Sequence, residues 1–358
     1  MKIGLFGFPG VGKTTLFSAL TGAEAPVAGA RREAHLGMVR VPDPRLDRLS
    51  EMYKPKKTTP ATVDFVDLVG FQRDDASASF DIEALKTVDA LAHVVRAFDS
   101  DLPHSEGDID PARDVATMET ELILADHSVL DKRAGRLRGL EQKRGLDGEE
   151  KAELLVMESC LEHLGEDRPL RLMELSEDAE RLLRGYGLLS ARPLLIVVNV
   201  GENEVDKIVD PQGAFQLQEA AGGEQVAVCA ASAQIEMEIS RLDDEDVATF
   251  MEDLGLTEPA RHRIIRAAYD LLGLESFFTV GEDECRAWTI RKGTPARVAA
   301  GVIHSDLERG FIRAEVIGYD DLMECGSLPK ARDKGVLRLE GKDYPVADGE
   351  IVHVRFNV

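Results

Sequence analysis

The sequence lacks any apolar run long enough to cross a membrane. The longest, at Leu194–Val198, has the length of a β-strand, whereas a membrane-spanning helix needs about 20 apolar residues. The stretch Met1–Phe6 carries one lysine and a very short apolar run, which is not typical of a signal peptide. We therefore expect a soluble, cytoplasmic protein with no membrane partner.

Cysteine is scarce, and its placement indicates neither a disulfide framework nor a metal site. The chain has four cysteines in 358 residues, with no C-x-x-C pair and no histidine at zinc-ligand spacing: Cys160, Cys229, Cys285 and Cys325. Isolated cysteines of this kind are typical of reduced thiols in a cytosolic protein.

Positive charge is also in short supply. Only 43 lysines and arginines stand against 66 aspartates and glutamates, which gives a net charge of −23. This balance argues against a generally cationic nucleic-acid-binding protein, although a local basic patch is compatible with it. The acidity is uneven, because residues 277–358 hold 12 basic against 14 acidic residues. This shift in composition predicts a domain boundary near Ser276.

The pattern of apolar residues predicts an α/β domain with a helical insertion. Residues 1–120 and 188–276 alternate short apolar runs with helical stretches, which favours a parallel sheet covered by helices. Residues 121–187 are rich in Leu, Glu, Arg and Lys and lack strand-like runs. We expect this middle segment to form an antiparallel helical hairpin, with its turn at Gly145–Gly148.

The C-terminal residues 277–358 change period again and predict a small β-rich domain. Arg286–Ile290 and Phe311–Ile317 have the composition of strands. Tyr344–Val346 and Ile351–Phe356 flank an Asp-Gly pair, which predicts that these two segments form a β-hairpin.

A phosphate-binding loop is the strongest functional signal. Gly7–Thr14 satisfies G-x-x-x-x-G-K-[ST], follows the predicted strand Ile3–Phe6 and opens a predicted helix. In this context Lys13 would neutralise the β- and γ-phosphates and the Thr14 hydroxyl would ligate Mg²⁺. The alternative is a glycine-rich turn with a chance lysine. The residues expected to bind nucleotide here are Gly10, Val11, Gly12, Lys13, Thr14 and Thr15.

A second signal follows the predicted strand at Val63–Asp67, which ends in D-x-x-G. Asp67 would hold Mg²⁺ through water, and the amide of Gly70 could sense the γ-phosphate. The motif is common by itself, but it gains weight at this distance after a phosphate-binding loop. We therefore expect Thr14 and Asp67 to form the metal site.

The base pocket is predicted after the strand Leu194–Val198. Asn199, Val200 and Glu202 lie where a guanine-reading protein has N-K-x-D, in which the aspartate accepts two hydrogens from the guanine edge. Here valine replaces the lysine and the acid is one methylene longer, so guanine loses its main advantage. Backbone groups of Ala230–Ser232 could also contact the base. The alternative is a loop asparagine and an unrelated surface glutamate.

These residues resemble the YchF-type branch of Obg-like P-loop ATPases over nearly the whole chain. The matching segments include Val41–Asp47, Lys54–Pro60, His93–Arg96, Asn199–Glu202, Arg286–Ile290, Ala300–His304, Gly310–Glu315 and Glu340–Tyr344. The resemblance implies a P-loop domain with a helical insertion and a C-terminal TGS domain, a ubiquitin-like β-grasp module. It also implies preference for ATP over GTP, dependence on Mg²⁺, and association with ribosomes or RNA.

The chain departs from that family in two segments that sense the γ-phosphate. Residues 22–49 contain no Ser or Thr, so the switch I threonine that closes over Mg²⁺ is missing, and residues 71–79 replace a longer glycine-rich switch II. Phe71 stands where Ras-type proteins have a water-positioning glutamine. The resemblance instead assigns that role to His104, in a polar loop with little to bury, which we expect to be mobile. The alternative is an ordinary solvated loop histidine. Gln72 is a rival, and Arg31-Arg32 could contact phosphate.

The function predicted is a slow, Mg²⁺-dependent ATPase, with GTP less favoured, coupled to ribosome or RNA binding. The alternatives are a nucleotide-binding, ribosome-interacting module with degenerate switches and little hydrolysis, or GTP as the preferred nucleotide. Six basic residues against one acidic residue in 132–144 could contact RNA phosphates, although a solvated helix face is the commoner explanation for such a run. A small-molecule kinase is disfavoured, and the sequence predicts no oligomeric state.

Overall fold

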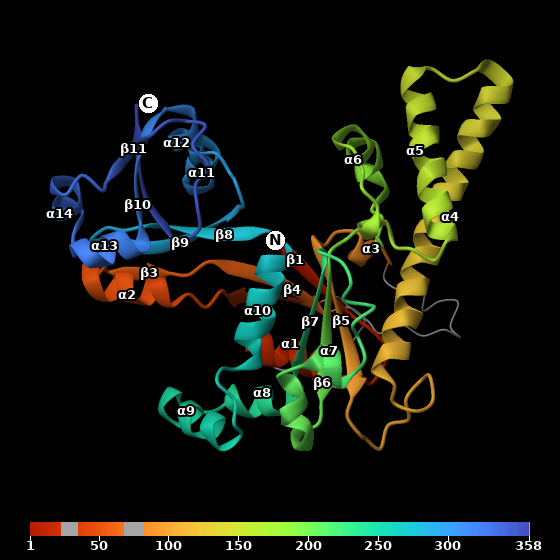
Figure 1. The fold of residues 1–358 in the computed structure, drawn as a ribbon, viewed down its shortest axis with the longest axis horizontal. Helices are drawn as coiled ribbons and strands as arrows, with labels where there is room; N and C mark the ends of the chain where they lie inside the picture. The colour runs from red at the N-terminus through yellow and green to blue at the C-terminus, as the bar shows by residue number, and fades with distance from the viewer. Residues whose placement is uncertain (23–34, 68–81, 358) are drawn as a thin grey trace. The chain divides into compact units, whose positions relative to one another are not determined.

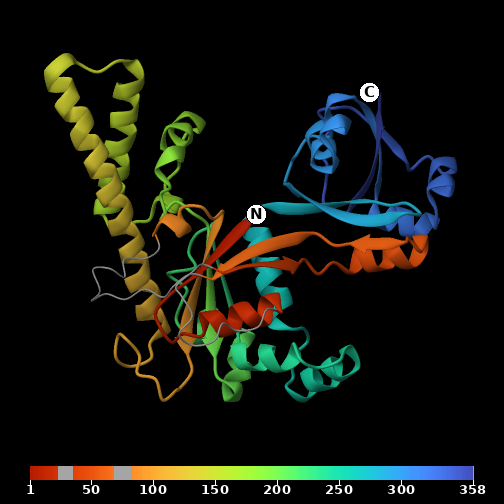
Figure 2. The same ribbon diagram turned by 180° about the vertical axis from the view of Figure 1, so that it is seen from behind.

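The computed structural model describes residues 1–22, 35–67 and 82–357, and the chain folds as two compact units. The first unit contains residues 1–37 and 64–271, and the second contains residues 38–63 and 272–358. Figures 1 and 2 show the ribbon from opposite sides, coloured from red at the N-terminus to blue at the C-terminus. Within these described residues, the strands form two six-stranded sheets.

The first sheet has the strand order β2-β4-β1-β5-β6-β7. Its strands are β1 (Lys2–Phe6), β2 (His35–Arg40), β4 (Thr62–Asp67), β5 (Ala90–Ala97), β6 (Leu194–Val200) and β7 (Val226–Ala231). From β4 to β7 each neighbouring pair is parallel. Strands β5 and β6 are buried along their whole length, because helices shield both faces of such a sheet from water. The predicted α/β fold with a parallel sheet is therefore confirmed.

Several helices cover this sheet. α1 (Lys13–Thr21) follows β1 and packs against α8 (Ala233–Ile239), and the two lie side by side in both views. α10 (Ala260–Leu271) packs against β6 and β7. Shorter elements of this unit are α3 (Ile82–Leu85), η3 (Glu202–Ile208), α7 (Pro211–Ala214) and α9 (Asp244–Asp253). Because parallel strands end at one edge, the loops after them meet there, where α/β folds bind ligands.

A long helical hairpin is inserted between β5 and β6. α4 (Pro111–Arg144) and α5 (Gly148–Gly165) run antiparallel, in yellow and yellow-green in Figure 1. Their turn lies at Gly145–Gly148 as predicted, since Gly145 ends α4 at a φ of 73° and Asp147 caps α5. α4 begins at Pro111, before the expected start of the insertion at residue 121, because Asp110 caps its first turn.

The chain returns from the hairpin to β6 through short helices: η1 (Leu170–Leu172), α6 (Glu177–Leu183) and η2 (Arg184–Tyr186). A buried cluster joins them to the hairpin, and it includes Leu137, Met157, Cys160, Leu164, Leu170 and Leu183. Asp126 of α4 accepts hydrogen bonds from the amides of Leu189 (2.8 Å) and Ser190 (2.7 Å), which fixes the returning chain. Among the described helices, none is long and apolar enough to span a membrane.

The second unit contains a mixed sheet with the strand order β11-β10-β12-β8-β9-β3. Its strands are β3 (Lys57–Thr59), β8 (Leu274–Thr279), β9 (Glu284–Arg291), β10 (Phe311–Gly318), β11 (Arg338–Glu340) and β12 (Glu350–Phe356). α11 (Ala296–Ile303) packs Ala296 and Ala299 into a buried cluster with Phe277, Val316 and Val352. This mixed sheet with a helix packed on it agrees with the β-grasp domain expected. The other helices are α2 (Pro44–Tyr53), α12 (Ser305–Arg309), α13 (Tyr319–Cys325) and α14 (Leu328–Asp333).

The predicted hairpin of Tyr344–Val346 with Ile351–Phe356 is wrong. β12 instead pairs antiparallel with β10 and parallel with β8. The backbone of the earlier segment has other partners, because Ala296 N–H donates to the Tyr344 carbonyl (2.7 Å) and Val346 N–H donates to the Thr294 carbonyl (3.0 Å). Hydrogen bonds to a distant loop thus outcompete the local turn.

Residues 38–63 pack with the C-terminal residues, although we expected them within the domain formed by residues 1–120 and 188–276. β3 pairs parallel with β9, and Arg45 of α2 donates two hydrogen bonds to the Asp348 carboxylate (2.6 and 3.2 Å). The domain limits 1–120 with 188–276, 121–187 and 277–358 stay predictions. The structure adds that an N-terminal segment contributes a helix and an edge strand to the second unit.

Candidate nucleotide-binding site

The loop between β1 and α1 has the backbone of a phosphate cradle. Gly10 and Gly12 adopt φ values of 74° and 90°, which residues with a side chain rarely adopt. Gly12 is the N-cap of α1 and provides no side-chain acceptor, so the first N–H groups of the helix face the loop without a capping side chain. Such a helix N-terminus attracts anions. Val11, which lies between the two glycines, is buried.

Lys13 lies against this loop. Its Nζ donates hydrogen bonds to the carbonyls of Phe8 (2.7 Å) and Gly7 (3.2 Å), and the residue is buried. Burial lowers the pKa of Lys13 to about 8, and the nearby Asp67 carboxylate opposes this shift. Among the described residues, the hydrogen-bond partners of this ammonium group are backbone carbonyls, and a phosphate would be a stronger partner.

Thr14, in the first turn of α1, is hydrogen-bonded to Asp67, the last residue of β4, the strand next to β1. Thr14 Oγ1 donates to Asp67 Oδ2 (2.9 Å), while Asp67 Oδ1 is buried and has no hydrogen-bond partner among the described residues. Burial raises the pKa of Asp67. This hydroxyl and carboxylate fit Mg²⁺, which takes one or two protein oxygens and completes its shell with phosphate and water. Among the described residues, no group of three or more His, Cys, Asp or Glu side chains could hold a metal ion.

A cleft of about 540 Å³ adjoins the loop, at the end of β6. Its lining includes the expected Asn199, Val200 and Glu202, together with Gly12 and Thr15 of the phosphate loop. Asn199 is buried and bridges two elements, since its Nδ2 donates to the Val11 carbonyl (2.9 Å) and its Oδ1 accepts from Ala233 N–H (2.9 Å). Asn199 therefore fixes the wall of the cleft, and both of its polar atoms have protein partners.

The other two expected base contacts differ in exposure. Val200 is buried at the end of β6, whereas Glu202 is exposed as the first residue of η3. Within the described part of the chain, the Glu202 carboxylate makes no hydrogen bond or ion pair. Ser232 caps α8 through its hydroxyl. Of the residues at this wall, Glu202 is thus free to accept hydrogens from a ligand.

Sequence reasoning missed the contribution of the segment after β5. Phe98 and Asp99 line the same cleft, opposite the loop after β6. Because β5 lies between β1 and β6 in the sheet, the residues that follow it reach the same edge as the phosphate loop. The strand order could not be read from the sequence, so this neighbour could not be assigned.

His104 is buried, in contrast to the solvated position that we expected. Its side chain is 1% exposed, its ring packs edge-on to Phe8 of the phosphate loop, and Nε2 lies 2.9 Å from Asp114 Oδ2 in the first turn of α4. Nδ1 accepts a hydrogen bond from Glu106 N–H (3.2 Å), so the proton of a neutral ring lies on Nε2, facing Asp114. Burial raises the pKa of Asp114, against the opposing effect of Arg113.

The remaining residues predicted to sense the γ-phosphate lie outside the described residues. These are Gly70, Phe71, Gln72, the rest of residues 71–79, and Arg31-Arg32. The site that can be described is therefore the phosphate loop, the Thr14–Asp67 pair, the cleft at Asn199–Glu202 and the buried His104.

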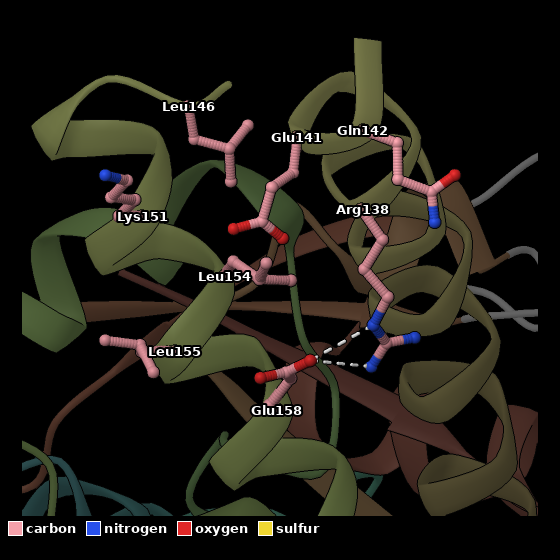
Figure 3. Close-up of a pocket in the computed structure, with 8 residues that line it drawn as sticks. All are labelled: Arg138, Glu141, Gln142, Leu146, Lys151, Leu154, Leu155 and Glu158. Atoms are coloured by element: carbon pink, nitrogen blue, oxygen red, sulfur yellow. Dashed lines mark hydrogen bonds and ion pairs between the residues drawn. The ribbon is translucent and has the colours of Figure 1, made fainter. Parts of the chain in front are cut away.

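Three of the six basic residues at 132–144 form ion pairs within the hairpin. Arg133 pairs with Glu153, Arg138 with Glu158, and Arg144 with Glu150, each across the two helices. Figure 3 shows Arg138 and Glu158 joined at a cleft of about 560 Å³, which is lined by both helices. The solvated-face interpretation is thus supported for these three arginines, whose charge is balanced within the hairpin.

These features define the class of protein. A parallel sheet, a glycine-rich loop that opens α1, an Asp at the end of the neighbouring strand and an Asn-containing cleft beside them are the parts of a P-loop NTPase domain of the GTPase type.

Comparison with known proteins agrees with this class and narrows it. A 50S ribosome-binding GTPase family model matches residues 2–127, and a YchF GTPase C-terminal family model, described as a protein of unknown function, matches residues 274–357. The chain is 41% identical over 369 residues to the ribosome-binding ATPase YchF of Bacillus subtilis, and the match covers 100% of both chains. It is 39% identical over 365 residues to that of Escherichia coli O157:H7, with coverage of 100% and 99%.

A solved structure shows the same fold. The Schizosaccharomyces pombe YchF GTPase is 31% identical and superposes with a TM-score of 0.82, covering 99% of this chain and 97% of that chain. The chain belongs to the YchF family, as the resemblance in its motifs predicted.

Proposed function

We propose that this protein binds Mg²⁺ with ATP, and less favourably GTP, and hydrolyses the nucleotide slowly to the diphosphate and phosphate. The observation that carries the proposal is the Thr14–Asp67 pair, with an unpaired buried oxygen, beside the buried Lys13 ammonium. Thr14 and Asp67 would hold Mg²⁺, and the ion would offset the negative charge of the phosphates. P-loop NTPases in general use this ion.

Each element of the site has a separate role in the proposal. Backbone N–H groups from Gly10 to Thr15 cradle the phosphates, and Lys13 exchanges its two backbone carbonyls for β- and γ-phosphate oxygens. Thr14 and Asp67 hold the metal ion. Asn199 keeps the cleft wall attached to the loop, while Glu202 and Val200 face the base. The phosphate loop and the cleft lie next to each other, since Gly12 and Thr15 line both.

His104 positions the attacking water in this proposal. In this structure Nδ1 accepts a hydrogen bond from Glu106 N–H, and Nε2 faces Asp114. The ring must therefore leave Glu106 before it can accept a hydrogen bond from water. His104→Ala is expected to lower turnover at least about tenfold while the Kd for ATP stays within about threefold, which is the signature of a group that acts only in the transition state. Unchanged turnover would remove His104 from the mechanism.

Nucleotide preference depends on the segment Asn199–Glu202. A guanine-reading site combines a carboxylate that accepts from the guanine edge with a lysine that covers the base. This chain has Val200 in place of the lysine and a longer acid at Glu202. The double variant V200K/E202D restores the N-K-x-D pattern. Titration of labelled ATP and GTP is expected to give tighter ATP binding for the parent chain and a shift towards GTP for the variant. Tighter GTP binding by the parent chain would reverse the assignment.

The ribosome is the partner that we propose for this protein. The relatives that cover the whole chain are named ribosome-binding ATPases, and RNA is the other partner that the resemblance suggests. Co-sedimentation of the protein with ribosomes, with ATP, ADP or no nucleotide, tests it. Binding that depends on the nucleotide supports a switch, whereas absence of co-sedimentation in every state refutes the proposal.

A second function is favoured by one observation in the sequence. Residues 22–49 contain no Ser or Thr to close over Mg²⁺, and a chain without this ligand could bind nucleotide and ribosome with little hydrolysis. Tight ATP binding with turnover no faster than that of Lys13→Ala would select this alternative.

A further inference from the structure

Arg96 is a buried arginine that the proposed mechanism does not use. It lies near the end of β5 and is 2% exposed. No carboxylate in the described part of the chain forms an ion pair with it. A guanidinium without a carboxylate is costly to bury, so its hydrogen-bond partners must justify its position.

Those partners are backbone carbonyls of the loop that follows β5. Arg96 Nε donates to the Phe98 carbonyl (2.9 Å), Nη1 to the Leu102 carbonyl (2.9 Å) and Nη2 to the Ser100 carbonyl (3.4 Å). The guanidinium also lies over the Phe98 ring, 4.9 Å from its centroid. The acceptors are alternate residues, so the loop wraps around one planar group whose N–H donors have fixed directions.

The same loop joins the two parts of the site that sequence reasoning treated separately. At its start, Phe98 lines the cleft beside Glu202, and two residues after Leu102 the chain reaches His104. Arg96 also lies close to the phosphate loop, since its Nη1 is 4.0 Å from the point that a Cβ on Gly10 would occupy. The Arg96 side chain therefore binds the backbone that runs from the base cleft to His104, and it lies beside the phosphate loop.

We propose that Arg96 is a positioning residue that holds residues 98–104 in one conformation and so couples occupation of the base cleft to the placement of His104. The catalytic half of this inference depends on the role proposed above for His104. A nucleotide base that moves Phe98 moves the backbone carbonyl that Arg96 binds, and the change reaches Leu102 through the same guanidinium. Lysine cannot replace it, because a single ammonium cannot reach three carbonyls in this planar arrangement.

The test is hydrogen exchange of the full chain, with and without ATP, for the parent, Arg96→Lys and Arg96→Met. Arg96→Lys keeps the charge and Arg96→Met keeps most of the volume. Arg171→Lys is the control for replacing a buried arginine away from this loop, because Arg171 donates to the Arg192 carbonyl (2.8 Å) and pairs with Glu119 (2.7 Å). In both Arg96 variants we expect amides of residues 98–106 to exchange at least about tenfold faster, with β1 and β6 unchanged. The control should leave residues 98–106 unchanged.

Unchanged exchange in residues 98–106 would overturn the proposal. So would faster exchange spread evenly over β1, β5 and β6, because that result describes a structural role in the sheet alone. If Arg96→Met does not fold, Arg96→Lys decides the question.

Turnover provides an independent readout of the coupling. Arg96→Lys is expected to lower turnover at least about tenfold and to weaken ATP binding, whereas His104→Ala should lower turnover alone. In the double variant the losses should not add, because Arg96 acts through His104. Additive losses would contradict the coupling. If His104→Ala leaves turnover unchanged, the proposed function of His104 fails, while the exchange experiment still decides whether Arg96 holds the loop.

Discussion

Asn199 provides the sharpest single test of how the site is built. Its amide connects two loops, because Nδ2 donates to the Val11 carbonyl and Oδ1 accepts from Ala233 N–H, both at 2.9 Å and both buried. In Asn199→Ala these two backbone groups lose their partners. The structure therefore predicts that this variant is destabilised even without nucleotide.

The expected loss follows from the number of groups left unpaired. A buried donor or acceptor that loses its partner costs about 1–3 kcal/mol, so two of them give about 2–6 kcal/mol in the free energy of unfolding. Water that enters the space left by the side chain would bring the value towards the lower limit. Asn203, which is exposed and lines the same cleft, is the matched control. We expect Asn203→Ala to change stability by less than about 0.5 kcal/mol.

Two measurements on the nucleotide-free protein check this prediction. Urea unfolding followed by far-ultraviolet circular dichroism gives the change in stability. Hydrogen exchange of a peptide that contains Ala233 shows whether its N–H has lost protection. If stability and exchange are unchanged while ATP affinity falls, Asn199 acts on the base alone and the bridging role is refuted.

Two further predictions concern buried ionisable groups. Since the pKa of Lys13 is about 8 in the free chain and phosphate favours the ammonium form, ATP binding above that pH requires uptake of a proton. The affinity for ATP should therefore be independent of Lys13 below about pH 8 and fall by up to about tenfold per pH unit above it. ATP titrations from pH 7 to 9.5 measure this dependence. If the affinity of Lys13→Ala falls with pH in the same way, the assignment to Lys13 is refuted. The same shift makes the contribution of Lys13 to folding stability rise with pH between about 8 and 10.5, because the unfolded chain binds more protons there. Asp126→Asn replaces a carboxylate that accepts from the amides of Leu189 and Ser190 by a group with one acceptor oxygen, so it should lower the free energy of unfolding by about 1–3 kcal/mol. Thermal unfolding measures this loss, with Asp131→Asn, at an exposed position on the same helix, as the control. Equal losses in the two variants would contradict the anchoring role of Asp126.

The phosphate loop could be predicted from the sequence because its chemistry is local. Glycines, a lysine and a threonine at fixed spacing within Gly7–Thr14 determine both the backbone conformation and the groups that face a phosphate. Asp67 was found the same way, from its position at the end of a strand. The hairpin turn at Gly145–Gly148 could likewise be predicted, since the cap residues that end one helix and begin the next are adjacent in the chain.

Features that depend on tertiary neighbours could not be predicted. The loop around His104 is polar in sequence, yet the histidine is buried because Phe8, far away in the chain, and Asp114, in the first turn of α4, pack against it. Arg133 and Arg138 were counted as free charge, but the hairpin brings each opposite a glutamate 20 residues later. The strand partner of β12 was missed for the same reason, since hydrogen bonds to Thr294 and Ala296 occupy the segment expected to pair with it.

The central claim is that the loop Gly7–Thr14 and the Thr14–Asp67 pair bind Mg²⁺ with a nucleoside triphosphate and release its terminal phosphate. The most direct measurement is phosphate release from ATP and from GTP, side by side with Mg²⁺, for the parent chain and Lys13→Ala. We predict slow release that is faster with ATP and disappears in Lys13→Ala. Release that persists in Lys13→Ala, or no release from either nucleotide despite tight binding, would contradict the claim.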